Sequence, residues 1–328
     1  MPSSNKSEIA KRTLQFLESE HFFSTPGING DHISRLGAFL QAEYDCIPEK
    51  ERVGKGAIYI STAVARATMQ YWQSIKKGHV LDLAHRVLAF SQAASRAGEA
   101  GMNRIIPHFS IIFMAESVAL TPLAWSLVEE QALEWASSKT WELRETSIYP
   151  FIEGIKHYPE ILFPKLEAWA KSSNPNIRRV VAESLRPRAE IIWLRNPDKN
   201  DHVLEILSLM RQDPAEYVRK SVGNNLKDLT KYMPEKILSL AESWVEAARI
   251  NVSLDIVSRS KKDLGDENYY LIWTLKQAMR WIQARNPEFH SRIAGILGSN
   301  YIKYYEEKKN KMARPGKKTE ILEDDSDD

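Results

Sequence analysis

Two stretches of this 328-residue sequence decide its fold, and they are spelled almost alike: NPNIRRVVAES at residues 174–184 and DPAEYVRKSV at residues 213–222. Each starts with a side chain, Asn174 or Asp213, that can accept a hydrogen bond from the first free backbone N–H groups of a helix. Each then places proline at the first helical position, where the missing N–H costs nothing. Both stretches therefore predict a helix start, and their likeness predicts that one helical hairpin is used at least twice.

The same signals recur at a regular interval. Arg144, Arg178 and Arg219 are 34 and 41 residues apart, and a Pro-Glu pair follows the first and the last of them by 15 residues. Trp169 and Trp244 come ten residues after those prolines. Paired helices repeating at this interval are typical of HEAT-like solenoids, in which each hairpin buries its apolar face against the next. The sequence therefore predicts an all-α fold, a right-handed α-solenoid of HEAT-like helical-hairpin repeats with one concave groove.

The rest of the chain agrees with a helical protein. No stretch of alternating apolar and polar residues dominates, and apolar residues recur at helical spacing outside the repeats. These segments are residues 8–20, 32–42, 51–75, 78–93 and 267–299. We expect one domain over residues 1–305, with its clearest repeats at 125–250. The charged end, residues 306–328, is expected to be a disordered tail.

Composition excludes several kinds of protein. The chain has 45 Lys and Arg against 43 Asp and Glu, a formal net charge of +2, so any nucleic-acid role needs its cations gathered on one face. Its one cysteine, Cys46, excludes an internal disulfide and a cysteine zinc cluster. Histidines do not cluster at metal-ligand spacing, so we expect no metal and no cofactor. The sequence shows neither a signal peptide nor a run of 18 apolar residues, so we expect a cytoplasmic protein without a membrane partner.

Two pairs of polar and aromatic residues stand at helical spacing. Trp141 and Glu145 are four residues apart and share one helix face, as do Asn224 and Asp228 in the corresponding helix of the last clear repeat. Because equivalent helices line the same wall of a solenoid, both carboxylates could face one groove together with several cations. Those cations are Arg178, Arg179, Arg186, Arg188, Arg219, Lys220 and Lys227.

Each of these residues also has a purely structural interpretation. Glu145 can stabilise the N-terminal turn of its own helix, and Asp228 can pair with Lys227 or Lys231 in solvent. Trp141 can be packing. Arg178 and Arg179 are adjacent and cannot both face inward, so one of them is expected to pair between repeats.

Three motifs give the chain a family resemblance over residues 130–245. They are WELRETSIYPF at 141–151, RRVVAESLRPR at 178–188 and DPAEYVRKSVGNNLKD at 213–228. Together they resemble the AlkC branch of the AlkC/AlkD family of bacterial HEAT-like-repeat DNA glycosylases. The resemblance places Glu145 on the family's catalytic carboxylate and Asp228 on an aspartate near the lesion. After RPR, however, the AlkC branch continues with Leu-Pro-Trp, whereas Trp193 stands two places late here.

The resemblance implies a function and a partner. The protein would be a monofunctional DNA glycosylase that hydrolyses the N-glycosidic bond of cationic N3- or N7-alkylated purines, such as 3-methyladenine and 7-methylguanine. Its partner would be double-stranded DNA with alkylated bases, bound by a monomer in the bacterial cytoplasm at the nucleoid. Trp141, Asn224 and Trp193 would contact the lesion or its sugar, and the seven cations would bind phosphates.

This function agrees with the chemistry of the residues. A cationic purine is already a good leaving group, and a fixed carboxylate stabilises the positive charge that develops on the sugar as the bond breaks. Two other functions fit the same pattern. The protein could be a non-catalytic HEAT-like relative that binds branched or distorted DNA, or a HEAT scaffold that binds proteins.

Overall fold

The computed structural model describes most of the chain, and every described element is a helix. The described residues are 5–23, 30–52, 56–75, 80–99, 104–188, 191–250, 265–301 and 305. They contain α-helices, short 3-10 helices and turns but no strand, which confirms the all-α prediction. The predicted tail at residues 306–328 lies outside the described residues.

The chain forms two compact units, Met1–Trp169 and Ala170–Asp328, where the sequence analysis expects one domain. Each unit is described by itself. The prediction of a single concave groove along the whole chain therefore stays a prediction.

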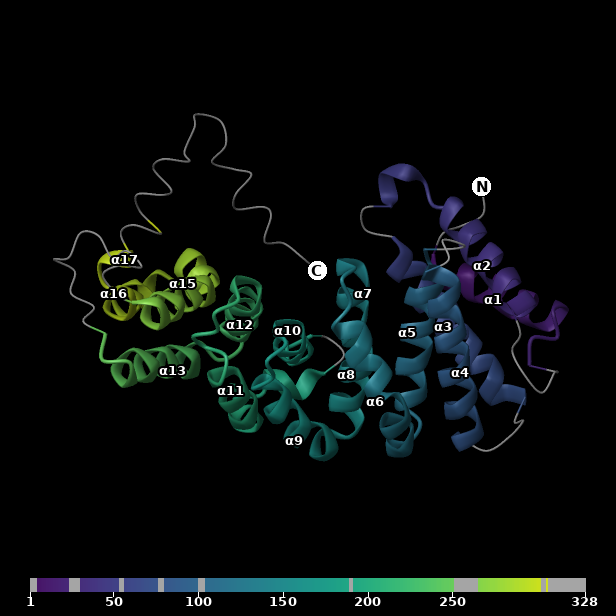
Figure 1. Ribbon diagram of the computed structural model, residues 1–328. Coiled ribbons are helices and arrows are strands. Elements are labelled where there is room, and N and C mark those ends of the chain that lie inside the picture. The colour runs from purple at the N-terminus through teal and green to yellow at the C-terminus, as the bar shows by residue number, and fades with distance from the viewer. Residues whose placement is uncertain are drawn as a thin grey trace. The chain divides into compact units, whose positions relative to one another are not determined.

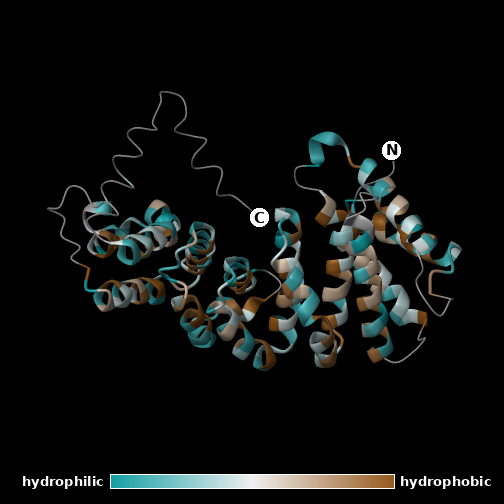
Figure 2. Ribbon diagram, in the orientation of Figure 1, coloured by the Kyte–Doolittle hydropathy of each residue, from teal (hydrophilic) through white to brown (hydrophobic). Residues whose placement is uncertain are grey.

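The first unit is built around one helix that is buried on all sides. Its elements are α1 (Lys6–Ser19), α2 (Gly30–Asp45), η1 (Glu49–Glu51), α3 (Ala57–Ile75), α4 (Val80–Glu99), α5 (Ile106–Val118), α6 (Pro122–Ala136), α7 (Trp141–Thr146), α8 (Ile148–His157) and α9 (Pro159–Ala170), whose last residue begins the second unit (Figure 1). Twelve of the thirteen residues of α5 are buried, and the helix packs against α3, α4 and α8. Brown, apolar residues occur along α5 and its neighbours (Figure 2). A helix that is apolar all round belongs in the middle of a core, and α5 occupies that place.

The second unit is built around α12. Its elements are α10 (Pro175–Ser184), η2 (Ile192–Arg195), η3 (Pro197–Lys199), α11 (Asp201–Ser208), α12 (Glu216–Leu229), α13 (Pro234–Ala247), α15 (Asp266–Arg285), η4 (Pro287–Phe289), α16 (His290–Leu297) and α17 (Ser299–Tyr301). Helix α12 lies between α10 and α15 and packs on both (Figure 1). Gly223 allows the approach to α15, because a Cβ there would stand 2.7 Å from the Cβ of Gln277. None of the described helices combines the length and apolarity that crossing a bilayer requires.

The starts of α10 and α12 are alike in sequence but differ in structure. Asn174 caps α10 as predicted, since its Oδ1 accepts a hydrogen bond from the Asn176 N–H at 2.9 Å. The prediction that Asp213 caps α12 is wrong, because that helix begins only at Glu216 with Ala215 at the capping position. Asp213 instead closes the turn before the helix by accepting from the Ala215 N–H at 2.9 Å.

The regularly spaced arginines form a repeated structural contact, which we call the arginine clasp. In each case the Nη1 group donates to the backbone carbonyls six and five residues earlier, in the turn before the helix. The carbonyls belong to Ser138 and Lys139 for Arg144, to Ser172 and Ser173 for Arg178, and to Asp213 and Pro214 for Arg219, at 2.6–3.2 Å. The clasp satisfies carbonyls that helix hydrogen bonds leave open and fixes the angle at which the helix leaves its turn.

One clasp also joins neighbouring hairpins. The Arg178 guanidinium donates from Nε and Nη2 to the two carboxylate oxygens of Asp213, at 2.5 and 2.8 Å. Hydrogen bonding to Asp213 raises the pKa of Arg178 further, against the opposing effect of burial. This contact confirms the expectation that one of the two adjacent arginines, Arg178 or Arg179, pairs between repeats.

Loss of a clasp should cost stability. Arg219 is 5% exposed, so Arg219→Met leaves the buried carbonyl oxygen of Asp213 and the partly buried one of Pro214 without their donor, and we expect the free energy of unfolding to fall by about 2–4 kcal/mol. Urea unfolding followed by circular dichroism measures the change. The matched control is Lys220→Met at the next, exposed position, which should change stability by less than about 0.5 kcal/mol. Equal losses in the two variants would contradict a structural role for Arg219.

Candidate functional site

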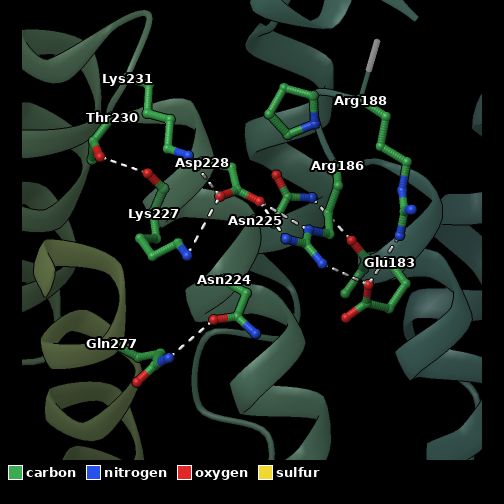
Figure 3. Close-up of polar contacts among 12 residues, drawn as sticks. Glu183, Arg186, Arg188, Asn224, Asn225, Lys227, Asp228, Thr230, Lys231 and Gln277 are labelled. Carbon is green, nitrogen blue, oxygen red and sulfur yellow. Dashed lines mark hydrogen bonds and ion pairs between the residues drawn. The ribbon is translucent and has the colours of Figure 1, made fainter. Parts of the chain in front are cut away.

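Four polar residues project from the C-terminal half of α12 and the turn after it. Lys227 and Asp228 follow Asn224 by three and four residues, and Lys231 follows them by four and three, so all four lie on one side of the helix. Figure 3 shows the carboxylate of Asp228 between the two lysine side chains and a guanidinium from a neighbouring segment.

That guanidinium belongs to Arg186, which lies in the turn just after α10. Its Nε and Nη2 atoms donate to Oδ2 of Asp228 at 3.0 and 2.5 Å (Figure 3). The other oxygen, Oδ1, lies 3.7 Å from Nζ of Lys227 and 3.9 Å from Nζ of Lys231. Asp228 is therefore fixed in place by three cations that come from two parts of the chain.

Glu183, a second and buried carboxylate, extends this group. Its Oε2 atom lies 3.3 Å from Nη1 of Arg186 and 3.5 Å from Nη2 of Arg188. Burial works against the charge of Arg186, but the carboxylates of Glu183 and Asp228 outweigh it, and the pKa of Arg186 is raised. We call these six residues the Asp228 cluster: Glu183, Arg186, Arg188, Lys227, Asp228 and Lys231.

The Asp228 cluster combines two electrostatic properties. Its four cations outnumber its two carboxylates, so it carries a formal excess of two positive charges and can attract an anion such as a phosphate. It also holds one carboxylate, that of Asp228, partly exposed and in a fixed position. Such a carboxylate can stabilise a positive charge that develops next to it.

Two more of the candidate residues lie in the second unit. Asn224 is half-buried, and its Oδ1 accepts a hydrogen bond from Nε2 of Gln277 at 2.9 Å, which orients the amide (Figure 3). Trp193 is half-buried on η2, beside Ile192, whose side chain is 71% exposed. The η2 turn, which carries Ile192 and Trp193, is joined to the RPR segment at residues 186–188, since Arg195 Nε donates to the Pro187 carbonyl at 3.2 Å.

The other predicted pair lies on α7 in the first unit. Trp141 is 61% exposed and Glu145 is half-buried. Pro150 interrupts no helix: α7 ends at Thr146, and Pro150 is the third residue of α8, where its missing N–H needs no helical partner. Since Glu145 and Asp228 belong to different units, their sharing one groove stays a prediction.

A buried histidine fixes α7 against α5. Thr146 is fully buried, and its Oγ1 lies 2.6 Å from Nδ1 of His108. Burial lowers the pKa of His108 below its ordinary value of 6.5, and the nearby Glu142 opposes this only in part. The imidazole is therefore neutral at neutral pH.

The structure requires two corrections to the expected phosphate ligands. The guanidinium groups of Arg178 and Arg219 already form the clasps. The Arg219 guanidinium also lies over the ring of Tyr270, 4.1 Å from its centre. Arg219 is buried, so a phosphate cannot reach it. Arg179 is half-buried and Lys220 is exposed, and their roles stay predictions.

Sequence reasoning left three residues out of the candidate site, although it named Lys231 as a structural partner of Asp228. Glu183 and Lys231 each stand three residues from a residue that was selected, Arg186 and Asp228, so helical spacing could have found them. Gln277 lies 53 residues from its partner Asn224, and no signal in one sequence links the two. Among the described residues, no group of three or more His, Cys, Asp or Glu side chains is placed to hold a metal ion.

A family model described as DNA alkylation repair enzyme matches residues 118–282, half of the chain, and this range contains both the α7 pair and the Asp228 cluster. The chain belongs to this family, which confirms the resemblance found in the sequence.

Individual relatives match this chain either over a short segment or at low sequence identity. The chain is 38% identical over 89 residues to the uncharacterized protein YhaZ of Bacillus subtilis, a match that spans 26% of this chain and about a quarter of YhaZ. Two solved structures are similar. AlkD2 from Streptococcus mutans is 17% identical, with a TM-score of 0.49, 76% of this chain covered and 98% of that chain. The Pseudomonas fluorescens alkylpurine DNA glycosylase AlkC, bound to DNA containing an abasic site analog, is 19% identical, with a TM-score of 0.49, 91% of this chain covered and 69% of that chain.

A double-mutant cycle should detect the contact between Arg186 and Asp228. We expect Arg186→Met and Asp228→Asn to show a coupling of about 1–3 kcal/mol in the free energy of unfolding, because the pair is partly buried and charge-assisted. The exposed pair Glu8 and Lys11 serves as the control, and its coupling should stay below about 1 kcal/mol. Additive effects at Arg186 and Asp228 would show that the contact is not made in solution.

The buried histidine should make stability sensitive to acid. The folded-state pKa of His108 lies below 6.5, so the unfolded chain binds the proton more readily, and stability falls as the pH drops below about 6.5. Above that pH the histidine contributes no pH dependence. We expect His108→Gln to lose less stability than the unmodified protein between pH 7.5 and 5.5, measured by urea unfolding at each pH. The control is His85→Gln at an exposed position, which should keep the pH dependence of the unmodified protein. A stability profile of His85→Gln as flat as that of His108→Gln would argue against His108 as the cause.

Proposed function

We propose that this protein is a monofunctional DNA glycosylase that releases cationic N3- or N7-alkylated purines, such as 3-methyladenine and 7-methylguanine, from double-stranded DNA. The observation that carries the proposal is the Asp228 cluster, where a fixed carboxylate stands within an excess of positive charge. Membership of the DNA alkylation repair enzyme family supports the same reaction class.

The excess cations of the cluster suit the phosphates on either side of a damaged nucleotide. Arg188, Lys227 and Lys231 lie 3.5 Å or more from the carboxylates of the cluster, so a phosphate can compete with those carboxylates for each of them. Arg186 is different, because its bond to Asp228 at 2.5 Å holds the carboxylate in place. We assign it to positioning Asp228, with Arg179 and Lys220 as further phosphate contacts.

The two carboxylates suit different parts of the reaction. As the bond to a cationic purine breaks, positive charge builds on the sugar, and water must then attack the same carbon. Asp228 already accepts two N–H groups of Arg186 on one oxygen, which suits it to stabilising charge rather than to taking a proton. We also propose that Glu145 orients and deprotonates the water, and that Asn224, Trp193 and the exposed ring of Trp141 each contact the sugar or the lesion.

Release of methylated bases from alkylated duplex DNA tests the proposal. We expect Glu145→Gln to slow excision by at least about 100-fold while leaving duplex affinity unchanged, because one preorganised electrostatic group is lost. Asp228→Asn should also slow excision, yet it should tighten duplex binding, since a negative charge leaves a group of cations. The control is Glu130→Gln, an exposed carboxylate on α6, which should excise at the native rate.

Other outcomes separate the alternatives. Duplex binding without release of any alkylated base would select the non-catalytic DNA-binding relative. In either DNA-binding case, the logarithm of the binding constant should fall with the logarithm of salt by about 0.9 for each phosphate contacted. A protein with no duplex affinity at low salt would instead be a protein-binding scaffold, and native excision by Glu145→Gln would remove that residue from the mechanism.

A further inference from the structure

The connection between α10 and α11 is long for this chain. It covers residues 185–200, whereas the corresponding connections after α8 and α12 are Tyr158 alone and residues 230–233. Its described part holds η2, η3 and the RPR segment, which supplies Arg186 and Arg188 to the Asp228 cluster. Connections of this length inside a compact unit are uncommon and often carry a function.

The η2 turn in the middle of this connection is anchored to the second unit at several points. Two apolar side chains in and before it, Ile191 and Leu194, are buried. The carbonyl of Leu194 accepts a hydrogen bond from Nδ2 of the buried Asn200 at 2.5 Å, and Arg195 joins η2 to the RPR segment. The side chains of η2 therefore project from a fixed base.

Ile192, the first residue of η2, is the most exposed apolar side chain of this region. It is 71% exposed, more than any other large apolar side chain in the described part of the chain. A partner that covered it would gain the free energy of removing apolar surface from water. A single exposed apolar residue is ordinary on a protein surface, so the surroundings of Ile192 decide whether it has a role.

Those surroundings are the cations of the Asp228 cluster. Residues three apart in a 3-10 helix lie on one side of it, so Ile192 and Arg195 leave η2 in the same direction. Arg195 donates from Nε to the Pro187 carbonyl, and its guanidinium carbon lies 5.0 Å from the ring centre of Tyr232. Pro187 and Tyr232 are direct sequence neighbours of three cations of the cluster. Ile192 therefore lies beside this positive charge, and Tyr232, which is 42% exposed, adds apolar surface there.

An exposed apolar side chain beside an excess of cations fits a partner that offers both negative charge and apolar surface. Duplex DNA offers phosphates on its outside and the apolar faces of its bases where two base pairs are pulled apart. Proteins that bend DNA insert isoleucine, leucine or similar side chains at such steps. Membership of the DNA alkylation repair enzyme family favours DNA over an acidic protein surface as the partner.

We propose that Ile192 is a wedge that inserts into the base stack of duplex DNA next to the damaged nucleotide, while the cations of the Asp228 cluster hold the phosphates beside it. The inference rests on the proposed function and adds to it the means by which the duplex is opened. Ile192 supplies no group to the reaction. Its contribution is to unstack one base step and bend the duplex there.

The fluorescence of 2-aminopurine, a base analogue that brightens when it is unstacked, tests the proposal. One duplex carries a stable abasic analogue with 2-aminopurine as the next base on one side, and a second duplex carries it on the other side. We expect saturating full-length protein to raise the fluorescence at least about twofold on one of the two sides. Ile192→Ser should abolish this rise and weaken binding about tenfold, whereas Ile192→Leu should keep both the rise and the affinity.

The salt dependence of binding separates a wedge from a phosphate contact. Ile192→Ser should keep the slope of the binding constant against salt, because no phosphate contact is lost. Arg188→Gln should lower that slope by about 0.9 and still show the fluorescence rise at saturation. The control is Leu123→Ser on α6, where the side chain is 56% exposed, and it should match the unmodified protein in affinity and fluorescence.

The outcomes distinguish this proposal from the glycosylase proposal. Duplex binding without a fluorescence rise on either side, or a rise that persists in Ile192→Ser, would overturn the wedge and leave the glycosylase proposal standing, since excision is not measured. A rise that depends on Ile192 in a protein that releases no alkylated base would support the wedge and select the non-catalytic DNA-binding relative. Absence of duplex binding would overturn both proposals.

Discussion

The second unit depends on the pair of Arg178 and Asp213. This contact joins the start of α10 to the turn before α12, and the clasps of Arg178 and Arg219 fix each helix to its own turn. Helices α10 and α12 also pack against each other. The end of α10 therefore lies beside the end of α12, and Arg186 can reach Asp228.

The Asp228 cluster shows how a fold made of ordinary hairpins acquires a chemical group. Its carboxylates would be poor anion-binding elements alone, and its cations would repel one another. Together they leave a modest positive excess around one ordered carboxylate. A site of this kind can hold a phosphodiester chain while presenting negative charge at one point, and both are needed to break a glycosidic bond in DNA.

Much of the fold could be predicted from the sequence, because its signals are local. Asn174 and Pro175 marked the start of α10, and apolar residues at helical spacing marked α1, α2, α3 and α4. The prediction for Asp213 was wrong because aspartate is favoured both at helix N-caps and in turns, and the sequence alone does not distinguish the two. The site was predicted less well, since Arg178 and Arg219 look like DNA-binding arginines until their partners are known. The link from Asn224 to Gln277 depends on how α12 and α15 meet at Gly223, and no local pattern records that.

The arginine clasp constrains this sequence unequally at its two ends. Its acceptors are main-chain oxygens, and in this chain they belong to residues as different as Ser138, Lys139 and Pro214. Any amino acid supplies such an oxygen, so a substitution in the turn leaves the acceptors of the clasp in place, whereas substitution of the arginine removes the donor. The first residue of each turn is more restricted, because the side chains of Ser138, Ser172 and Asp213 each also accept a hydrogen bond from the N–H two residues later.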